Sequence, residues 1–183
     1  MRELRVAIRR AIRAGVDFVQ IREKDLSGRE LMELARWAVK EAGAGRTRII
    51  VNDRVDVAIA SGAAGVHVGR ESAAVEEVVR WVRRVRGQGA SKFLVGVSCH
   101  SVEEVRNAER DGADYVHFGP VFETPSKRRF GKPQGLERLR EVCEAVRIPV
   151  LAVGGIEAGN VEECLRAGAA GVAGIRRFQE KRS

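Results

Sequence analysis

The sequence predicts a single α/β domain over residues 1–183, built as a TIM (β/α)₈-type barrel. Seven short apolar runs alternate with stretches of helical periodicity, which indicates a parallel sheet with helical crossovers. Four of the runs follow a glycine in similar segments, "RAGVDFVQ", "ASGAAGVHVG", "RDGADYVHFG" and "RAGAAGVAG", spaced by about 50 residues, or two repeats of roughly 25. Polar residues and glycines end most runs, as at the mouth of a barrel, whereas an open doubly wound sheet would carry one glycine-rich phosphate loop.

The first elements begin with "MRELRVAIRRAIRAG", an amphipathic pattern that predicts a helix of the mature protein and not a signal or transit segment. A strand is expected at residues 16–21. In "SGRELMELARWAVKEAG" Ser27 and Glu30 form the pattern of a capping box, and Gly43 ends the predicted helix. The run "RIIVND" predicts the second strand and "RVDVAIASG" a short helix.

The later elements follow the same alternation. "GVHVG" predicts a strand, and "SAAVEEVVRWV" a helix with Ser72 as its N-cap. "KFLVGVS" predicts the fourth strand, after which "SVEEVRNAERDG" repeats the capping pattern with Ser101 and Glu104. The runs "DYVHFG", "IPVLAVGG" and "GVAGIR" predict the last three strands, and near-continuous apolar stretches such as "VLAV" fit strands that are covered on both faces.

Composition excludes several classes of protein. No apolar run approaches the roughly 18 residues that a membrane span needs, so we expect a soluble protein with no membrane partner. Three scattered cysteines without a CxxC pair argue against disulfides and zinc, and favour a reducing, cytoplasmic location. Cys99 is expected to be a core residue, because its neighbours Ser98 and His100 point to the opposite face of the strand.

The net charge of +8 favours an anionic ligand over a nucleic acid. Arginines such as Arg80, Arg83 and Arg84 spread around a predicted helix, and aromatic residues make up only 5% of the chain, too few for a base-stacking platform. We therefore expect no specific nucleic-acid partner.

The stretch "FVQIREKDLSG" places Gln20, Arg22 and Lys24 at every second position where the first predicted strand ends. Alternate residues of a strand face the same side, so these three side chains should converge on the barrel mouth. A guanidinium, an ammonium and an amide suit a diphosphate ligand. The alternative is a solvated strand end with ordinary salt bridges.

Seven motifs, in order and in spacing, resemble the thiamine phosphate synthase and thiazole tautomerase family of barrels from about residue 2 to about 178. They are "VQIREKD", "VNDR", "GVHVG", "GVSCHS", "DYVHFGPVFETPSK", "PVLAVGGI" and "GAAGVAGI". The resemblance implies a transferase of thiamine biosynthesis, with the synthase branch favoured. Such an enzyme joins hydroxymethylpyrimidine diphosphate to a thiazole phosphate, releases pyrophosphate and uses Mg²⁺ as cofactor.

The resemblance also implies roles for particular residues. Ser98 and Lys127 would be catalytic, with Ser98 near the reacting pyrimidine and diphosphate. The residues implied in holding the pyrimidine diphosphate are Gln20, Arg22, Lys24 and Asn52. Those implied in holding the thiazole phosphate are Thr124, Ser126, Lys127, Gly154, Gly155, Ile175 and Arg176, the last standing where the family usually has a serine.

Magnesium would be held by Asp53, which matches the family's first magnesium carboxylate, and by Ser72, which stands where the family has a second. Glu71 is a displaced substitute ligand. Taken without the resemblance, Asp53 reads as a turn residue that caps the next short helix, and Ser72 as an N-cap. A serine in place of an aspartate weakens the expected magnesium affinity.

Two other functions stay open. The tautomerase branch uses a histidine where this chain has Pro120, and "VFET" favours that branch, while Gln20, Lys24, Asn52 and Asp53 favour the synthase. The second alternative is a non-catalytic homologue that binds phosphates.

The likeness also implies two missing elements. The family begins with a strand that would precede residue 2 and ends with a longer eighth helix, so an open edge is expected between residues 16–21 and 171–175. An unpaired edge invites association, so a homo-oligomer is one expectation. Our hypothesis is a start codon placed too late; the alternatives are a seven-stranded barrel closed by a partner and a decayed paralogue.

Overall fold

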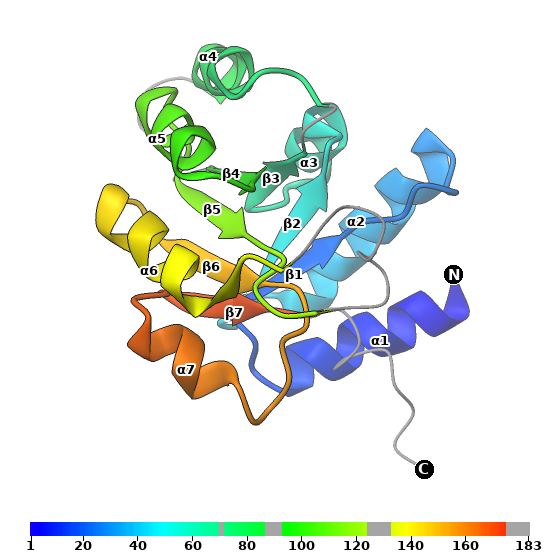
Figure 1. Cartoon of the computed structure of the whole chain (residues 1–183). Coiled ribbons are helices and arrows are strands. Elements are labelled where there is room, and N and C mark those ends of the chain that lie inside the picture. Colours follow the sequence, from blue (N-terminus) through cyan, green and yellow to red (C-terminus); the bar gives the residue numbers. More distant parts are fainter. Residues whose placement is uncertain (70–71, 87–92, 124–132, 175–183) are drawn as a thin grey trace.

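The computed structural model describes residues 1–69, 72–86, 93–123 and 133–174 (Figure 1). Its strands are β1 (Phe18–Ile21), β2 (Arg48–Asn52), β3 (Gly65–Val68), β4 (Leu94–Cys99), β5 (Tyr115–Phe118), β6 (Val150–Val153) and β7 (Gly171–Ala173). Its helices are α1 (Arg2–Arg13), α2 (Gly28–Ala42), α3 (Val55–Ser61), α4 (Val75–Arg86), α5 (Val102–Arg110), α6 (Gly135–Ala145) and α7 (Val161–Arg166). All seven predicted strands are confirmed.

The strands form one parallel sheet in which each strand pairs with the next one in the sequence, from β1 to β7. A strand, a crossover and a parallel strand make a right-handed turn, so successive crossovers of the same hand place the helices on one side of the sheet. Figure 1 shows the helices around the outside of a sheet that curls inward. The predicted TIM-like α/β fold is confirmed, in the form of a curled half-barrel.

The two edges of this half-barrel are β1 and β7. In the described part of the chain, β1 pairs only with β2, and β7 only with β6. The open edge expected from the sequence is therefore present between residues 18–21 and 171–173. No hydrogen-bond ladder joins these two strands, so helix packing and the rest of the sheet must set their separation.

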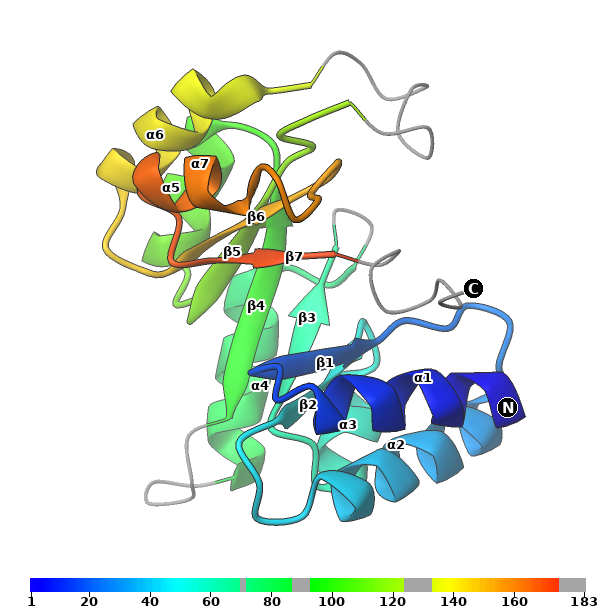
Figure 2. The ribbon, with the colours of Figure 1, turned by 90° about the horizontal axis from the view of Figure 1, so that it is seen from below.

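The helix α1 is fixed to the outer helical layer through Trp37 of α2, and Figure 2 shows the two helices side by side. Arg9 donates from Nε and Nη2 to the carboxylate of Glu41, at 2.7 and 2.9 Å. The guanidinium carbons of Arg5 and Arg9 lie 5.2 and 5.5 Å from the centroid of the Trp37 ring, within the range of cation–π contacts. The amphipathic helix predicted at the start of the chain thus packs against the next helix.

Among the serines predicted as N-caps, Ser27 and Ser101 are confirmed and Ser72 is not. Ser27 Oγ accepts from Glu30 N at 3.3 Å while the Glu30 carboxylate accepts from Ser27 N at 2.9 Å, so α2 has its full capping box. Ser101 caps α5 by accepting from Glu104 N at 3.1 Å. The prediction for Ser72 is wrong, because α4 begins at Val75 and the Ser72 hydroxyl donates to a side chain from another strand end.

The inner side of the sheet carries an apolar layer and, nearer the carboxyl ends of the strands, a polar one. The apolar layer contains Ile50, Leu94 and Tyr115. Ser98 comes four residues after Leu94 on β4, and His117 two residues after Tyr115 on β5, so both lie on the same side of the sheet as the apolar layer. His67 of β3 contacts both of them. The barrel interior is therefore polar below its mouth.

The two histidines lie against one another, with ring centroids 4.1 Å apart. His67 is 1% exposed. Burial lowers its pKa to about 2. Repulsion from a protonated His117 and from the Arg22 guanidinium acts on the pKa in the same direction. Burial lowers the pKa of His117 to about 4. Both rings are accordingly neutral at physiological pH.

These depressed pKa values predict a loss of stability in mild acid. The unfolded chain binds a proton on each histidine near pH 6.5, whereas the folded chain does so only near pH 4 and pH 2, so the unfolded state holds more protons below pH 6.5. The stability that depends on the two neutral histidines is fully present well above pH 6.5 and is lost as the pH falls below that value. Between pH 6.5 and 4.5 the free energy of unfolding, measured with urea, should fall by roughly 2 kcal/mol less in His117→Gln than in the wild type.

Above pH 7.5 the stability curves of His117→Gln and the wild type should run parallel, because the wild-type ring is neutral in both states there. Equal slopes below pH 6.5 would show that His117 titrates normally in the folded chain.

Candidate active site

The carboxyl ends of the first strands carry a continuous row of polar side chains. Gln20 of β1 donates from Nε2 to Asn52 Oδ1 of β2 at 2.7 Å. Asn52 donates from Nδ2 to Asp53 Oδ2 at 2.6 Å, and Ser72 donates from Oγ to Asp53 Oδ1. Parallel pairing places these strand ends at one rim, so residues distant in the sequence form one hydrogen-bonded set.

Asp53 is the centre of this set. Its backbone N–H donates to His67 O at 2.9 Å, and its Oδ1 also accepts from Gly69 N at 3.3 Å. Its φ of 60° lies in the left-handed region, which non-glycine residues seldom adopt. The interpretation of Asp53 as a helix cap is wrong, since the N-cap of α3 is Arg54 and no side chain caps that helix.

Ser72 lies beside Asp53, in agreement with the family resemblance, which implies that both residues hold magnesium. Besides its bond to Asp53, Ser72 Oγ accepts from Gly69 N at 2.8 Å. The two residues proposed as magnesium ligands are thus in direct contact. Among the described residues no group of three or more histidine, cysteine, aspartate or glutamate side chains could hold a metal ion. Glu71 lies outside the described residues.

Arg22 and Lys24 follow β1, which ends at Ile21. The alternation of a strand therefore does not extend to Lys24, which lies in the connection to α2, and this part of the geometric prediction is wrong. Arg22 is close enough to the barrel interior for its charge to lower the pKa of His67. Both side chains are exposed, and the structure gives neither an ion pair with another described residue.

Ser98 lies on β4, where its Oγ is 3.0 Å from His67 Nε2. His67 is therefore a hydrogen-bonded interior histidine. Cys99, the next residue, is 2% exposed, and burial raises the pKa of its thiol to about 12. The thiol is a core group and not a nucleophile, as predicted.

Gly154 and Gly155 follow β6 with φ of 93° and 67°. A Cβ on Gly154 would lie 2.6 Å from Pro120 Cα, and one on Gly155 would lie 2.7 Å from Phe122 Cβ. Packing against the chain after β5 is thus a second reason for glycine here, which the sequence did not reveal. The other predicted thiazole-phosphate contacts, Thr124, Ser126, Lys127, Ile175 and Arg176, lie outside the described residues.

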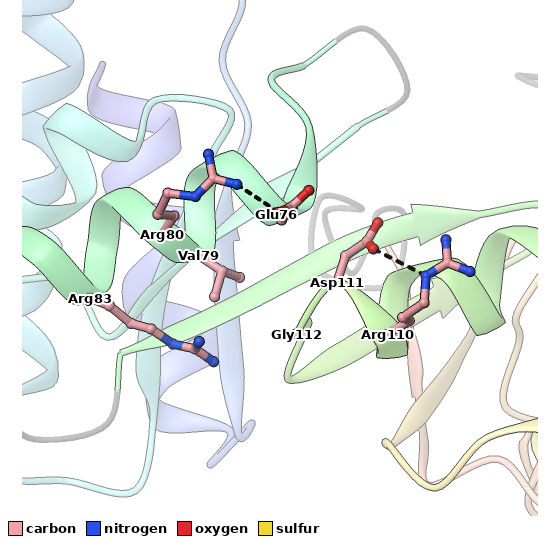
Figure 3. A pocket seen from close by; sticks show the side chains of 7 residues that line it. All are labelled: Glu76, Val79, Arg80, Arg83, Arg110, Asp111 and Gly112. Atoms are coloured by element: carbon pink, nitrogen blue, oxygen red, sulfur yellow. Dashed lines mark hydrogen bonds and ion pairs between the residues drawn. The ribbon is translucent and has the colours of Figure 1, made fainter.

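A groove of about 520 Å³ lies away from this rim, between α4 and α5 on the outer helical layer (Figure 3). Arg80 pairs with Glu76 at 2.6 Å, and Arg110 with Asp111 at 3.6 Å. None of the residues that line the groove is a predicted site residue. The polar rim of the sheet therefore remains the candidate site.

None of the helices that the structure describes is long and apolar enough to cross a membrane.

Comparison with known proteins identifies the family to which the chain belongs. The thiamine monophosphate synthase family, TMP-TENI, matches residues 1–178. The thiamine-phosphate synthase of Methanocella arvoryzae is 45% identical over 167 residues, which cover 91% of this chain and 76% of that protein. That of Roseiflexus castenholzii is 43% identical over 165 residues, or 90% and 69% of the two chains.

The solved structure of a thiamine phosphate pyrophosphorylase from Pyrococcus furiosus aligns with a TM-score of 0.80 at 34% identity, covering 96% of this chain and 81% of that one. The family match over nearly the whole chain, the identity to named synthases and this shared fold agree with the motifs at the strand ends: the chain belongs to the thiamine monophosphate synthase family.

Proposed function

We propose that the chain joins hydroxymethylpyrimidine diphosphate to a thiazole phosphate at the polar rim of its half-barrel, releasing pyrophosphate. The proposal rests on the hydrogen-bonded set of Gln20, Asn52, Asp53 and Ser72, together with Ser98 of β4. Its partners would then be small phosphorylated substrates. The cysteines, all free, suit a reducing cytoplasm.

In the proposed reaction, the bond between the pyrimidine methylene carbon and the diphosphate oxygen breaks, and the electron pair leaves with the diphosphate. The thiazole nitrogen then gives its lone pair to the resulting cation, forming a C–N bond. This chemistry needs no side-chain nucleophile. The protein contributes by positioning the two substrates and by stabilising the charge on the leaving group.

The exposed cations Arg22 and Lys24 have no ion pair with another described residue, so both are free to bind the diphosphate. A guanidinium offers two parallel donors to a phosphate group, and an ammonium a compact charge. The Gln20–Asn52 pair would fix the edge of the pyrimidine next to them. The thiazole phosphate would be held by Thr124, Ser126, Lys127, Ile175 and Arg176 with Gly154 and Gly155, an assignment that rests on the family likeness.

A magnesium ion fits this rim, where protein and substrate would both supply its ligands. Asp53 supplies one carboxylate and Ser72 a neutral hydroxyl, and magnesium is commonly held by one or two carboxylates together with substrate phosphates and water. When bound, the ion would neutralise charge on the departing diphosphate. Asp53 would also keep Asn52 oriented through the bond to its amide.

The first prediction from the proposed function concerns Asp53. In a magnesium-dependent coupling assay that follows thiamine phosphate and pyrophosphate, Asp53→Ala should lower kcat/KM by roughly 10- to 150-fold, the range expected for loss of a charged hydrogen-bonding group. Asp56→Ala is the matched control, because Asp56 pairs with Arg54 on the outside of α3 and should leave the rate unchanged.

Equal activity of the Asp53 and Asp56 variants would contradict the role of Asp53. Melting temperatures of both variants separate a loss of function from a loss of folding. No product from the wild-type chain would contradict the proposed reaction as a whole.

The second prediction concerns Ser72. Ser72→Asp places a second carboxylate beside Asp53, so the Mg²⁺ concentration for half-maximal activity should fall by about tenfold, whereas Ser72→Asn, of similar size and without charge, should not lower it. Calorimetric titration with Mg²⁺ in the presence of pyrophosphate gives the same comparison without turnover. If the aspartate and asparagine variants need the same Mg²⁺ concentration, position 72 does not lie at the metal.

A further inference from the structure

We propose that Tyr115 and His67 form a relay that fixes the Ser98 hydroxyl as a hydrogen-bond donor towards the barrel mouth. Neither Tyr115 nor His67 is among the residues assigned above to substrate or metal. Both would be positioning residues that act through Ser98. The identity of the group that accepts the hydrogen bond from Ser98 rests on the proposed function, whereas the relay itself does not.

The relay crosses three neighbouring strands. His67 of β3 lies with Nδ1 3.3 Å from the Tyr115 hydroxyl of β5 and with Nε2 3.0 Å from Ser98 Oγ of β4. His67 and Tyr115 are buried, while Ser98 is only partly so. One end of the relay is therefore closed inside the sheet, and the other reaches the rim.

The direction of the hydrogen bonds follows from the number of donors and acceptors. A neutral imidazole has one N–H and one acceptor nitrogen, and a phenol has one O–H. If Nδ1 carried the proton, it would donate to the Tyr115 oxygen, and the phenolic O–H would have no acceptor among the described residues. A buried unsatisfied donor costs about 1–3 kcal/mol, so the tautomer with the proton on Nε2 is favoured.

With the proton on Nε2, Tyr115 donates to Nδ1, and Nε2 donates to Ser98 Oγ. Ser98 then receives a hydrogen bond from inside the sheet, and its own O–H is free to donate outward. A hydroxyl held this way matches an anionic acceptor, which in the proposed reaction is an oxygen of the leaving diphosphate.

Gly96 provides the space for the relay. It lies on β4 between Tyr115 of β5 and His67 of β3, its partners in the ladder. A Cβ at Gly96 would overlap the Tyr115 ring, with two ring carbons at 2.5 Å. Because β4 has no side chain here, the phenol can lie across the strand and reach the imidazole.

The surroundings of His67 keep it neutral, as the relay requires. The ring of His117 from β5 lies against it, and the cationic Arg22 approaches from the end of β1. His67 is 1% exposed, and these neighbours offer no negative charge to a protonated ring, which would also have two donors and no acceptor for Tyr115.

The relay can be tested first without any substrate. In ¹⁵N-histidine-labelled wild-type protein at pH 7, the nitrogen shifts of His67 should report Nε2 protonated and Nδ1 as a hydrogen-bond acceptor. Tyr115→Phe removes only the hydroxyl, so the ¹⁵N chemical shift of Nδ1 should move towards the value of a nitrogen that accepts no hydrogen bond. Thr47→Val is the matched control, since it removes another buried hydroxyl, which bonds to Val16 O, and should leave the His67 signals unchanged.

A double-mutant cycle then tests whether the relay acts through Ser98. Tyr115→Phe should lower kcat by about 3- to 10-fold with little change in KM, and should have no further effect in a Ser98→Ala background. His67→Gln, whose amide can still donate near the position of Nε2, should retain more activity than His67→Met.

A His67 proton on Nδ1, or a Tyr115→Phe effect that adds fully to Ser98→Ala, would overturn the relay. An inactive wild-type chain with His67 protonated on Nε2 would instead overturn the proposed function and leave the relay supported by the nitrogen shifts.

Discussion

Pairing of every strand with its successor in the chain is the constraint on which the rest of the structure depends. Because β1 to β7 run parallel and in sequence order, each crossover returns the chain to the same end of the sheet, and the carboxyl ends of all strands meet at one rim. Gln20, Asn52 and Ser98 thereby lie towards the same rim without any local sequence relation. The backbone bond from Asp53 N to His67 O extends this pairing just beyond the strand and sets the position of the central carboxylate.

The interior of the half-barrel differs from its outer core. Between strands and helices, valine, leucine and alanine side chains pack as in any α/β protein. Inside the curl, His67 lies within hydrogen-bond distance of Tyr115 and Ser98, and the described residues contain no fully buried polar side-chain atom without a hydrogen bond. A polar interior of this kind holds neutral donors in fixed directions, which is useful where charge moves between two bound substrates.

Local patterns were sufficient for the elements but not for the site. The capping box of Ser27 and Glu30 and the apolar strands could be predicted because they depend on neighbours in the sequence. The local pattern alone indicated Ser72 as an N-cap, because its partner Asp53 is 19 residues away and the fold of the sheet brings them together; the family resemblance, not the local pattern, put the two at one site. The same limit applies to Tyr115, His67 and Ser98, which meet across three strands, and to Gly155, whose packing against Phe122 has no sequence signal.

The unjoined edges of β1 and β7 give ligands a structural role in addition to a chemical one. In the proposed arrangement, the pyrimidine diphosphate contacts the rim near β1 and the thiazole phosphate the glycines after β6, so the two substrates sit on opposite flanks of the open side. Once both are bound, they bridge flanks that no backbone ladder connects among the residues the structure describes. The bound substrates would then hold the two flanks together. The half-barrel would gain stability from its own reactants, because ligands that bind only the folded state shift the folding equilibrium towards it.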